Sequence, residues 1–180
     1  MNLSDGKNFL SDLKCNVNDS VLINFLEKKI EIVIPLKEKA KAIVFPKPRE
    51  ISIREVKVPE PKDNDVLTRT LYTGISTGTE TMLWTGRHPE RGGTTVFPMV
   101  PGYENIGEII KKGRNVSIPL GTRVFVGTTD FVKEYCVAWG GQVGYAVKDG
   151  KKVVPLPDDI DLEEATFLNI VSIALHGIKR

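Results

Sequence analysis

The chain has 180 residues, of which 41% are hydrophobic and 27% charged, and a formal net charge of +2 at pH 7. This is the composition of a globular protein that buries about 70% of the surface of its unfolded chain. So small a charge gives no electrostatic reason to expect nucleic acid or an anionic membrane as a partner, and no apolar run approaches the ~20 residues of a transmembrane helix. The N-terminus lacks the charged-then-apolar plan of a signal peptide. We therefore expect a cytoplasmic protein in which Cys15 and Cys136 are reduced thiols.

Residues 1–40 hold only one glycine and one proline, unlike the rest of the chain, and are predicted to be an N-terminal extension. The apolar stripe within 21–29 predicts a short helix, capped by Asp19 or Ser20. The alternation over 30–34 then predicts a strand. We find no chemical motif in this region.

Residues 41–160 are predicted to form a barrel of short strands. Apolar and alternating runs recur there, each bounded by glycine, proline, Asn or Asp, which is typical of an all-β barrel. The basic residues Arg54, Lys57, Arg69, Lys111 and Lys133 occupy the polar phases and are expected to face outward. The predicted strands are 41–45, 51–58, 66–73, 106–110, 122–129, 131–138, 145–149 and 152–157.

Residues 161–180 predict a helix. Asp161 is the expected N-cap residue, because its carboxylate can accept from free N–H groups at the helix start. Glu163 and Glu164 in the first turn interact favourably with the positive end of the helix dipole. The remainder is apolar almost all round, so the helix is expected to be buried, with His176 a satisfied buried histidine. Nothing in the 180 residues is left to cover it, and we interpret it as the start of a connection to a further domain.

Two clusters combine glycines with hydroxyls and carboxylates. They are "GISTGTE" (74–80) and "VPGYE" (100–104). A third glycine-rich stretch, "WGGQVGY" (139–145), lacks the spacing of a dinucleotide-binding turn and opens no helix, so it is interpreted as a simple turn.

The succession of segments from Lys41 to Ile178 resembles the N-terminal, GroES-like catalytic lobe of the medium-chain dehydrogenase/reductase superfamily, the relatives of zinc alcohol dehydrogenase. The pieces that carry the resemblance run in family order and cover about three quarters of the chain. They are "KAIVF", "VPEPKDNDVLTRTLYTGIS", "TGRHPERGGTTVFPMVPGYENIGEIIKKGRNVSIPLGTRVF", "FVKEYCVA" and "VPLPDDIDLEEATFLNIVSIALHGI". The resemblance implies a mainly β fold with a few helices: a GroES-like, partly open β-barrel whose C-terminal helix leads to a Rossmann domain.

The zinc ligands of the family are replaced in this chain. Where zinc-dependent members carry a cysteine, this chain has Ser76 or Thr77, and where they carry the histidine of Gly-His-Glu, it has Tyr103. Hydroxyl and phenol oxygens are poor zinc ligands at neutral pH, and no CxxC-like cluster exists for a structural zinc. The pattern resembles the branch that includes bacteriochlorophyllide dehydrogenase, in which zinc ligands are similarly absent.

The resemblance implies roles for six residues. Thr79 matches the proton-relay hydroxyl, and Tyr103 is expected to replace zinc by donating a hydrogen bond to the developing oxyanion. Glu104 would lie behind Tyr103 as a further catalytic-site group. Ser76, Thr77 and Glu80 would contact substrate or cofactor.

Structural alternatives stay open for each of these residues. The hydroxyls of Ser76, Thr77 and Thr79 could bond only within their own turn. Glu80 could cap a short helix, Tyr103 could be a rim aromatic with its hydroxyl in water, and Glu104 could be a turn or ion-pair residue. His88 is expected to be a surface histidine, and Trp84 and Trp139 to be packing residues.

We therefore expect the substrate-binding lobe of a zinc-independent oxidoreductase that acts on a small-molecule alcohol or carbonyl. NAD or NADP would bind only with the missing Rossmann domain or a partner chain, so the 180 residues alone are expected to be inactive. The alternative is a stand-alone GroES-like binding or assembly module whose apolar C-terminal helix serves homo-oligomerisation. A degenerate pseudoenzyme is a third reading that the sequence does not separate from the first.

Overall fold

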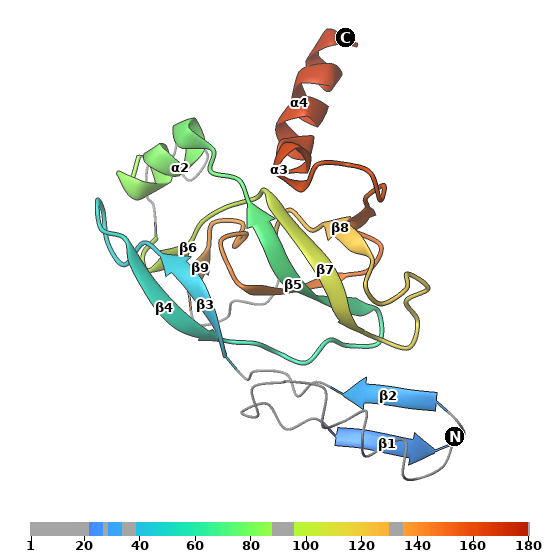
Figure 1. Cartoon of the computed structure of the whole chain (residues 1–180). Helices are drawn as coiled ribbons and strands as arrows, with labels where there is room; N and C mark the ends of the chain where they lie inside the picture. Colours follow the sequence, from blue (N-terminus) through green and yellow to red (C-terminus); the bar gives the residue numbers. More distant parts are fainter. Residues whose placement is uncertain (1–21, 27–28, 34–38, 88–95, 130–134, 180) are drawn as a thin grey trace. The chain divides into compact units, whose positions relative to one another are not determined.

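The computed structural model describes residues 22–26, 29–33, 39–87, 96–129 and 135–179. The chain divides into two compact units, 1–37 and 38–180. Figure 1 follows the elements of both units along the chain.

The first unit contains an antiparallel pair of strands. Strand β1 (Leu22–Leu26) pairs with β2 (Lys29–Val33), so that Leu22 lies opposite Val33. The strand predicted over 30–34 is confirmed for the described residues Ile30–Val33, but the helix predicted over 21–29 is wrong at Leu22–Leu26. A short apolar run fits either periodicity, and here pairing with a neighbouring strand decides the outcome.

The second unit is mainly β, as predicted, with three helices among its described residues. A five-stranded antiparallel sheet has the order β10-β5-β7-β8-β11, and its central strands β5 and β7 lie side by side in Figure 1. Strands β3 and β4 form an antiparallel pair, and β6 and β9 a short parallel one. The strands are β3 (Lys39–Val44), β4 (Ser52–Lys57), β5 (Asp65–Thr73), β6 (Met99–Val100), β7 (Asn105–Lys112), β8 (Arg123–Phe125), β9 (Cys136–Val137), β10 (Tyr145–Asp149) and β11 (Val154–Pro155).

Isolated bridges join the sheets into a partly open barrel. Ala42 of β3 bridges to Val143, and Phe45 bridges to Met99 of β6. Within the described part of the chain the sheets do not close into a complete barrel. All eight predicted strands have a counterpart, although β8, β9 and β11 are shorter than the runs that predicted them, and 131–134 lie outside the described residues.

Helix α2 (Thr77–Trp84) packs against the sheets through a buried apolar cluster. It contributes Leu83, which is fully buried in this cluster with Phe45, Met99 and Ala138. Burying a leucine fully contributes about 1.5–3 kcal/mol relative to leaving it exposed. Trp84 and Trp139 pack against the same cluster, which confirms their prediction as packing residues.

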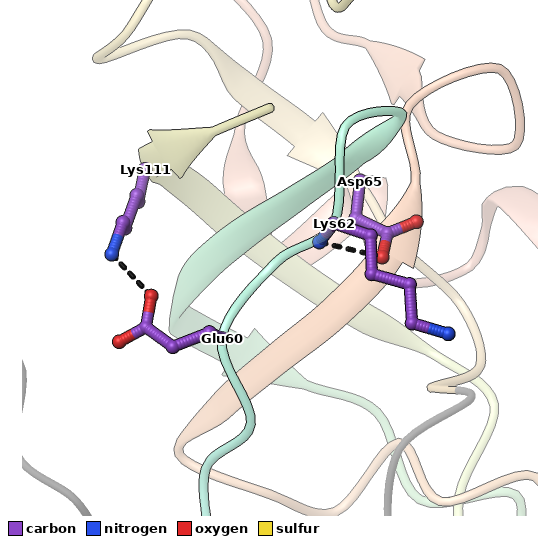
Figure 2. A network of polar contacts seen from close by, with 4 residues as sticks. All are labelled: Glu60, Lys62, Asp65 and Lys111. Atoms are coloured by element: carbon purple, nitrogen blue, oxygen red, sulfur yellow. Dashed lines mark hydrogen bonds and ion pairs between the residues drawn. The ribbon is translucent and has the colours of Figure 1, made fainter. Parts of the chain in front are cut away.

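Charged side chains hold the long connection between β4 and β5 to the sheet. Figure 2 shows Lys111 of β7 paired with Glu60, and the backbone N–H of Lys62 donating to the Asp65 carboxylate at 3.0 Å. Lys111 is exposed, as are Arg54, Lys57 and Arg69, so the predicted outward face is confirmed for these four. Lys133 lies outside the described residues.

The C-terminal segment forms two helices instead of the single one expected. Helix α3 (Leu162–Ala165) begins at Asp161, whose side chain accepts from the N–H groups of Glu163 and Glu164, as the capping prediction required. Helix α4 (Leu168–Ile178) follows and exposes a row of large apolar residues. His176 is exposed as well, so its prediction as a buried histidine is wrong. None of the helices in the described ranges is long and apolar enough to cross a membrane.

Candidate active site

The first predicted turn leaves β5 and leads into α2. Ser76 is the N-cap residue in an extended conformation, but its side chain makes no capping bond. Instead the Ser76 N–H donates to Glu80 Oε2 at 2.7 Å, so the carboxylate one turn into the helix satisfies a free donor at its start. Glu80 therefore does not start the helix as a cap, the alternative that the sequence left open, but lies inside α2 and accepts from the N–H of the N-cap residue Ser76.

The second predicted turn joins β6 to β7 and lies beside the first. The Gly74 N–H donates to the Glu104 carbonyl at 2.7 Å. A Cβ atom on Gly74 would lie 2.3 Å from Glu104 Oε2 and 3.0 Å from Glu104 Cβ, so a larger residue there would displace the buried Glu104 side chain. Gly102 has φ +96°, a conformation that also favours glycine.

This approach brings Tyr103 to Thr79. The Tyr103 hydroxyl lies 3.4 Å from Thr79 Oγ1, longer than an ordinary O–H···O bond of about 2.7–2.8 Å. The Tyr103 and Trp139 rings make a T-shaped contact, with the ring centroids 5.4 Å apart and the planes at 78°. The phenol is therefore oriented on one side by an aromatic contact while its hydroxyl points to a second hydroxyl.

The two hydroxyls lie on the wall of an open cavity of about 520 Å³. Thr79 and Tyr103 line it, and Ile173 contributes a side chain from α4. The remaining lining includes Gly127, Thr128, Trp139 and Lys148, together with Asn169. Most of the cavity surface is therefore apolar or neutral, with a few hydroxyl and amino groups that could orient a small polar ligand.

Two carboxylates lie buried under the turns. Glu104 is 2% exposed, and burial raises the pKa of its carboxyl group. Glu80 is 6% exposed; burial raises the pKa of its carboxyl group, while the bonds from Ser76 and Gln142 lower it and the charge of Glu104 raises it. Neither forms an ion pair with a lysine or arginine in the described part of the chain. Glu104 Oε1 is buried and accepts no hydrogen bond from a described residue.

The six predicted site residues thus fall into three positions. Thr79 and Tyr103 meet on the cavity wall. Glu80 and Glu104 lie beneath the turns and do not line the cavity. Ser76 is half-buried at the start of α2 and Thr77 is exposed, and neither lines the cavity. His88 lies outside the described residues.

The sequence did not single out several residues that build this site. Trp139 was expected only to pack, and Gln142 lay in a stretch interpreted as a simple turn. Thr128, Lys148 and Asn169 gave no local signal, because they come from three separate places in the chain: the loop after β8, strand β10 and helix α4. The glycine pair of "WGGQVGY" was the one available hint, since paired glycines mark close backbone approach.

Among the described residues, the groups on the two turns are not those that a catalytic zinc prefers. Both Glu80 oxygens already accept hydrogen bonds, from Ser76 and from Gln142. The remaining groups on the two turns are hydroxyls and the Glu104 carboxylate, and zinc prefers thiolate and imidazole. Across the ranges that the structure describes, no three His, Cys, Asp or Glu side chains are grouped as a metal site requires.

Comparisons with known proteins identify the family of the chain. Residues 62–158 match the family described as "Alcohol dehydrogenase GroES-like domain". The chain is 29% identical over 143 residues to the 2-desacetyl-2-hydroxyethyl bacteriochlorophyllide A dehydrogenase of Cereibacter sphaeroides, covering 76% of this chain and 44% of that protein. It is 27% identical to an uncharacterized zinc-type alcohol dehydrogenase-like protein of Haemophilus influenzae, covering 81% of this chain and 47% of that protein.

A solved structure shares the fold. The S. aureus protein TarJ in complex with NADPH superposes with a TM-score of 0.61 and 25% identity, over 79% of this chain and 41% of that one. The chain spans less than half the length of the curated relatives just named. On the family match, the order of its strands and the two adjoining turns, the chain belongs to the alcohol dehydrogenase GroES-like domain family of the medium-chain dehydrogenase/reductase superfamily.

Proposed function

We propose that this chain is the catalytic and substrate-binding lobe of a zinc-independent, NAD(P)-dependent oxidoreductase that interconverts an alcohol and a carbonyl compound. The observation that carries the proposal is the meeting of the Tyr103 and Thr79 hydroxyls on the wall of one cavity. The relatives named above support the reaction class, since one is a dehydrogenase and another binds NADPH.

The nicotinamide, held by a Rossmann domain of the full-length protein or by a partner chain, would exchange the hydride. The residues of this chain would donate a proton to the substrate oxygen, or accept one from it in the reverse reaction. Tyr103 donates its O–H to that oxygen as negative charge develops there, and Thr79 Oγ1 lies within reach to relay the proton. Such a donor lowers the barrier because it stabilises charge that exists only in the transition state.

The buried groups would act indirectly. Glu80 holds the start of α2, which carries Thr79, and Glu104 lies directly after Tyr103 under the same turn. Ser76 and Thr77 remain proposed contacts for substrate or cofactor. Any such contact would lie outside the cavity, because neither residue lines it.

Replacing Tyr103 tests the proposal. In the full-length protein, Tyr103→Phe keeps the ring against Trp139 and removes the hydroxyl, so we expect turnover to fall about 10²-fold or more with little change in stability. Tyr72→Phe is the matched control, since Tyr72 is 41% exposed on β5 and does not line the cavity. Steady-state kinetics with NAD(P)-linked alcohol and carbonyl panels provide the measurement. Unchanged turnover in Tyr103→Phe would remove this residue from the mechanism.

Metal content tests the zinc-independent part separately. We expect well below one zinc per chain in the purified full-length protein, because the two turns offer hydroxyls in place of thiolate and imidazole. Inductively coupled plasma mass spectrometry measures this directly, and full activity should persist after dialysis against a chelator. Stoichiometric zinc, or activity lost on chelation and restored by zinc, would refute this part of the proposal.

A second candidate, a binding or assembly module without catalysis, is favoured by one observation. Helix α4 exposes large apolar residues, among them Ile173 at 64% and Ile178 at 81%, as an interface would. The coding sequence beyond codon 180 distinguishes the two: a strand followed by G-x-G-x-x-G supports the oxidoreductase, and a stop codon supports the module. Either protein is proposed to work in the cytoplasm, without nucleic acid or membrane as a partner.

A further inference from the structure

The segment between β9 and β10, Trp139–Gly144, has more contacts with the site than a simple turn requires. Trp139 meets the Tyr103 ring, as described above. Gln142, three residues later, is 4% exposed although its side chain is polar. A polar side chain this deeply buried is expected to form hydrogen bonds within the protein, and its partners indicate its role.

The Gln142 side chain contacts the turn that carries Thr79. Its Nε2 donates to the Gly74 carbonyl at 2.8 Å and to Glu80 Oε1 at 3.3 Å. Its Oε1 accepts from the Thr73 hydroxyl at 2.7 Å, which fixes the orientation of the amide. One side chain therefore contacts residues on both sides of the turn, the end of β5 and the first part of α2.

The backbone of the same segment contacts the turn that carries Tyr103. The N–H of Gln142 donates to the Pro101 carbonyl at 2.9 Å, and that of Gly141 to the Gly102 carbonyl at 2.7 Å. A Cβ atom on Gly102 would lie 2.5 Å from Gln142 Cγ, and one on Gly141 would lie 2.8 Å from the Gly102 carbonyl. Two glycines are thus needed for the segment to fit against this turn.

We propose that Gln142 is the positioning residue that holds the two active-site turns in register, so that the hydroxyls of Thr79 and Tyr103 meet at one point of the cavity. It reaches the first turn with its side chain and the second with its backbone. The inference rests on the proposed function for its catalytic consequence, and on the contacts alone for its structural one. The two hydroxyl oxygens are already 3.4 Å apart, so a small shift of either turn would separate them beyond hydrogen-bonding distance.

A purely structural glutamine would affect stability only, so the test needs readouts that stability does not move. In the full-length protein, Gln142→Leu keeps the side-chain bulk and removes the amide. We expect kcat to fall about tenfold with a smaller change in KM, because misplaced catalytic groups weaken transition-state contacts more than ground-state ones. The ionised Glu80 carboxylate accepts from the Ser76 N–H at the start of α2, the helix that carries Thr79. The variant removes a donor that lowers the pKa of this carboxyl group, so the acidic limb of the kcat–pH profile should move to higher pH.

A second readout does not depend on activity. In a background that keeps Trp139 and replaces Trp84 and any further tryptophan of the full-length protein by phenylalanine, the emission of Trp139 reports its contact with Tyr103. We expect Gln142→Leu to change both the wavelength and the quenching of this emission. If the wild type proves to have no oxidoreductase activity, the proposed function fails while this measurement still decides the positioning role. Asn115→Leu is the matched control, because it removes an amide that bonds Asn64 at 2.9 Å on the exposed surface.

Thr73→Val keeps the test decisive if Gln142→Leu does not fold. It removes only the hydroxyl that orients the amide, and it should lower kcat and change Trp139 emission in the same direction by a smaller factor, about threefold for kcat. Wild-type kcat, pH profile and Trp139 emission in a folded Gln142→Leu would overturn the proposal. So would wild-type behaviour of folded Thr73→Val when Gln142→Leu is unfolded.

Discussion

At the scale of single residues, Glu104 is the clearest case of a group in an environment that its charge disfavours. It is 2% exposed, and one of its oxygens accepts no hydrogen bond from a described residue. Burial raises the pKa of its carboxyl group above the ordinary value. The folded state therefore binds this proton more tightly than the unfolded state does. It follows that Glu104 contributes most to stability at pH values below the pKa that its carboxyl group has in the unfolded chain. This contribution is lost as pH rises through the pKa of the same group in the folded state.

Glu104→Gln should remove this dependence. We expect the variant to be more stable than wild type at pH 8 by about 1 kcal/mol, because no buried carboxylate has to ionise, and to differ little at pH 4. Urea unfolding at the two pH values measures the difference. Glu55→Gln, which changes an exposed carboxylate on β4, should show no such gain. A Glu104→Gln variant that is less stable at pH 8 would show that the ionised carboxylate is stabilised by groups outside the described contacts.

At this scale the sequence predicted the site in part. The adjoining turns followed from family order, which places Thr79 and Tyr103 together although 24 positions separate them. Gln142 could not be found in the same way, because it bonds Gly74 across 68 positions and carries no motif of its own. Hydrogen bonds between distant segments leave no periodic trace in the sequence. Only the glycines that make room for them do.

At the scale of elements, local chemistry predicted well where one residue decides the outcome. The Asp161 side chain caps α3 as its residue type suggests, because an N-cap carboxylate bonds N–H groups two and three residues along. Prediction failed where partners decide. The apolar stripe over 21–29 fits a helix, yet Leu22–Leu26 pairs with Lys29–Val33 as a strand. Likewise, the sequence left open that Glu80 caps a short helix, whereas α2 begins at Thr77 and Glu80, one turn inside it, accepts from the N–H of Ser76 at its N-terminus.

The break between α3 and α4 is a further element-scale difference. The pattern over 161–178 is continuous in apolar character, but Thr166 donates its hydroxyl to the Glu163 carbonyl at 2.6 Å and the first helix ends there. Threonine side chains compete with the backbone for such carbonyls. The outcome is a short capped helix that packs Ala165 and Leu162 against Ile106 and Leu156, followed by a second helix whose residues are mostly exposed.

At the scale of the whole molecule, the exposed row on α4 should dominate the behaviour of the 180-residue chain in solution. We expect this chain to bind a hydrophobic dye such as ANS or to self-associate, because Ile173, Leu175 and Ile178 are each at least half exposed. Dye fluorescence and analytical ultracentrifugation measure the two effects. Replacing Ile173 and Leu175 by lysine should reduce both. Ile53→Lys, at a site 71% exposed on β4, is the control.

A dye-silent monomer would contradict this expectation and would mean that α4 is covered in solution.

The described residues include a cavity with hydroxyls on its wall but no dinucleotide-binding turn. The chain also spans less than half the length of the curated relatives named above. Catalysis is accordingly expected of the full-length protein, as the kinetic experiments above assume.

The parallel pairing of β6 with β9 has a consequence for how the molecule assembles. It joins Met99–Val100 to Cys136–Val137, and the bridge from Phe45 to Met99 adds a third segment that is remote along the chain. Each of these junctions closes a large loop, which costs chain entropy before any contact repays it. The β3–β4 pair needs no such closure. We therefore expect the β3–β4 pair to form early and the junctions that bring the two turns of the proposed site together to form late. On this expectation, a formed site would be evidence of a fully folded lobe.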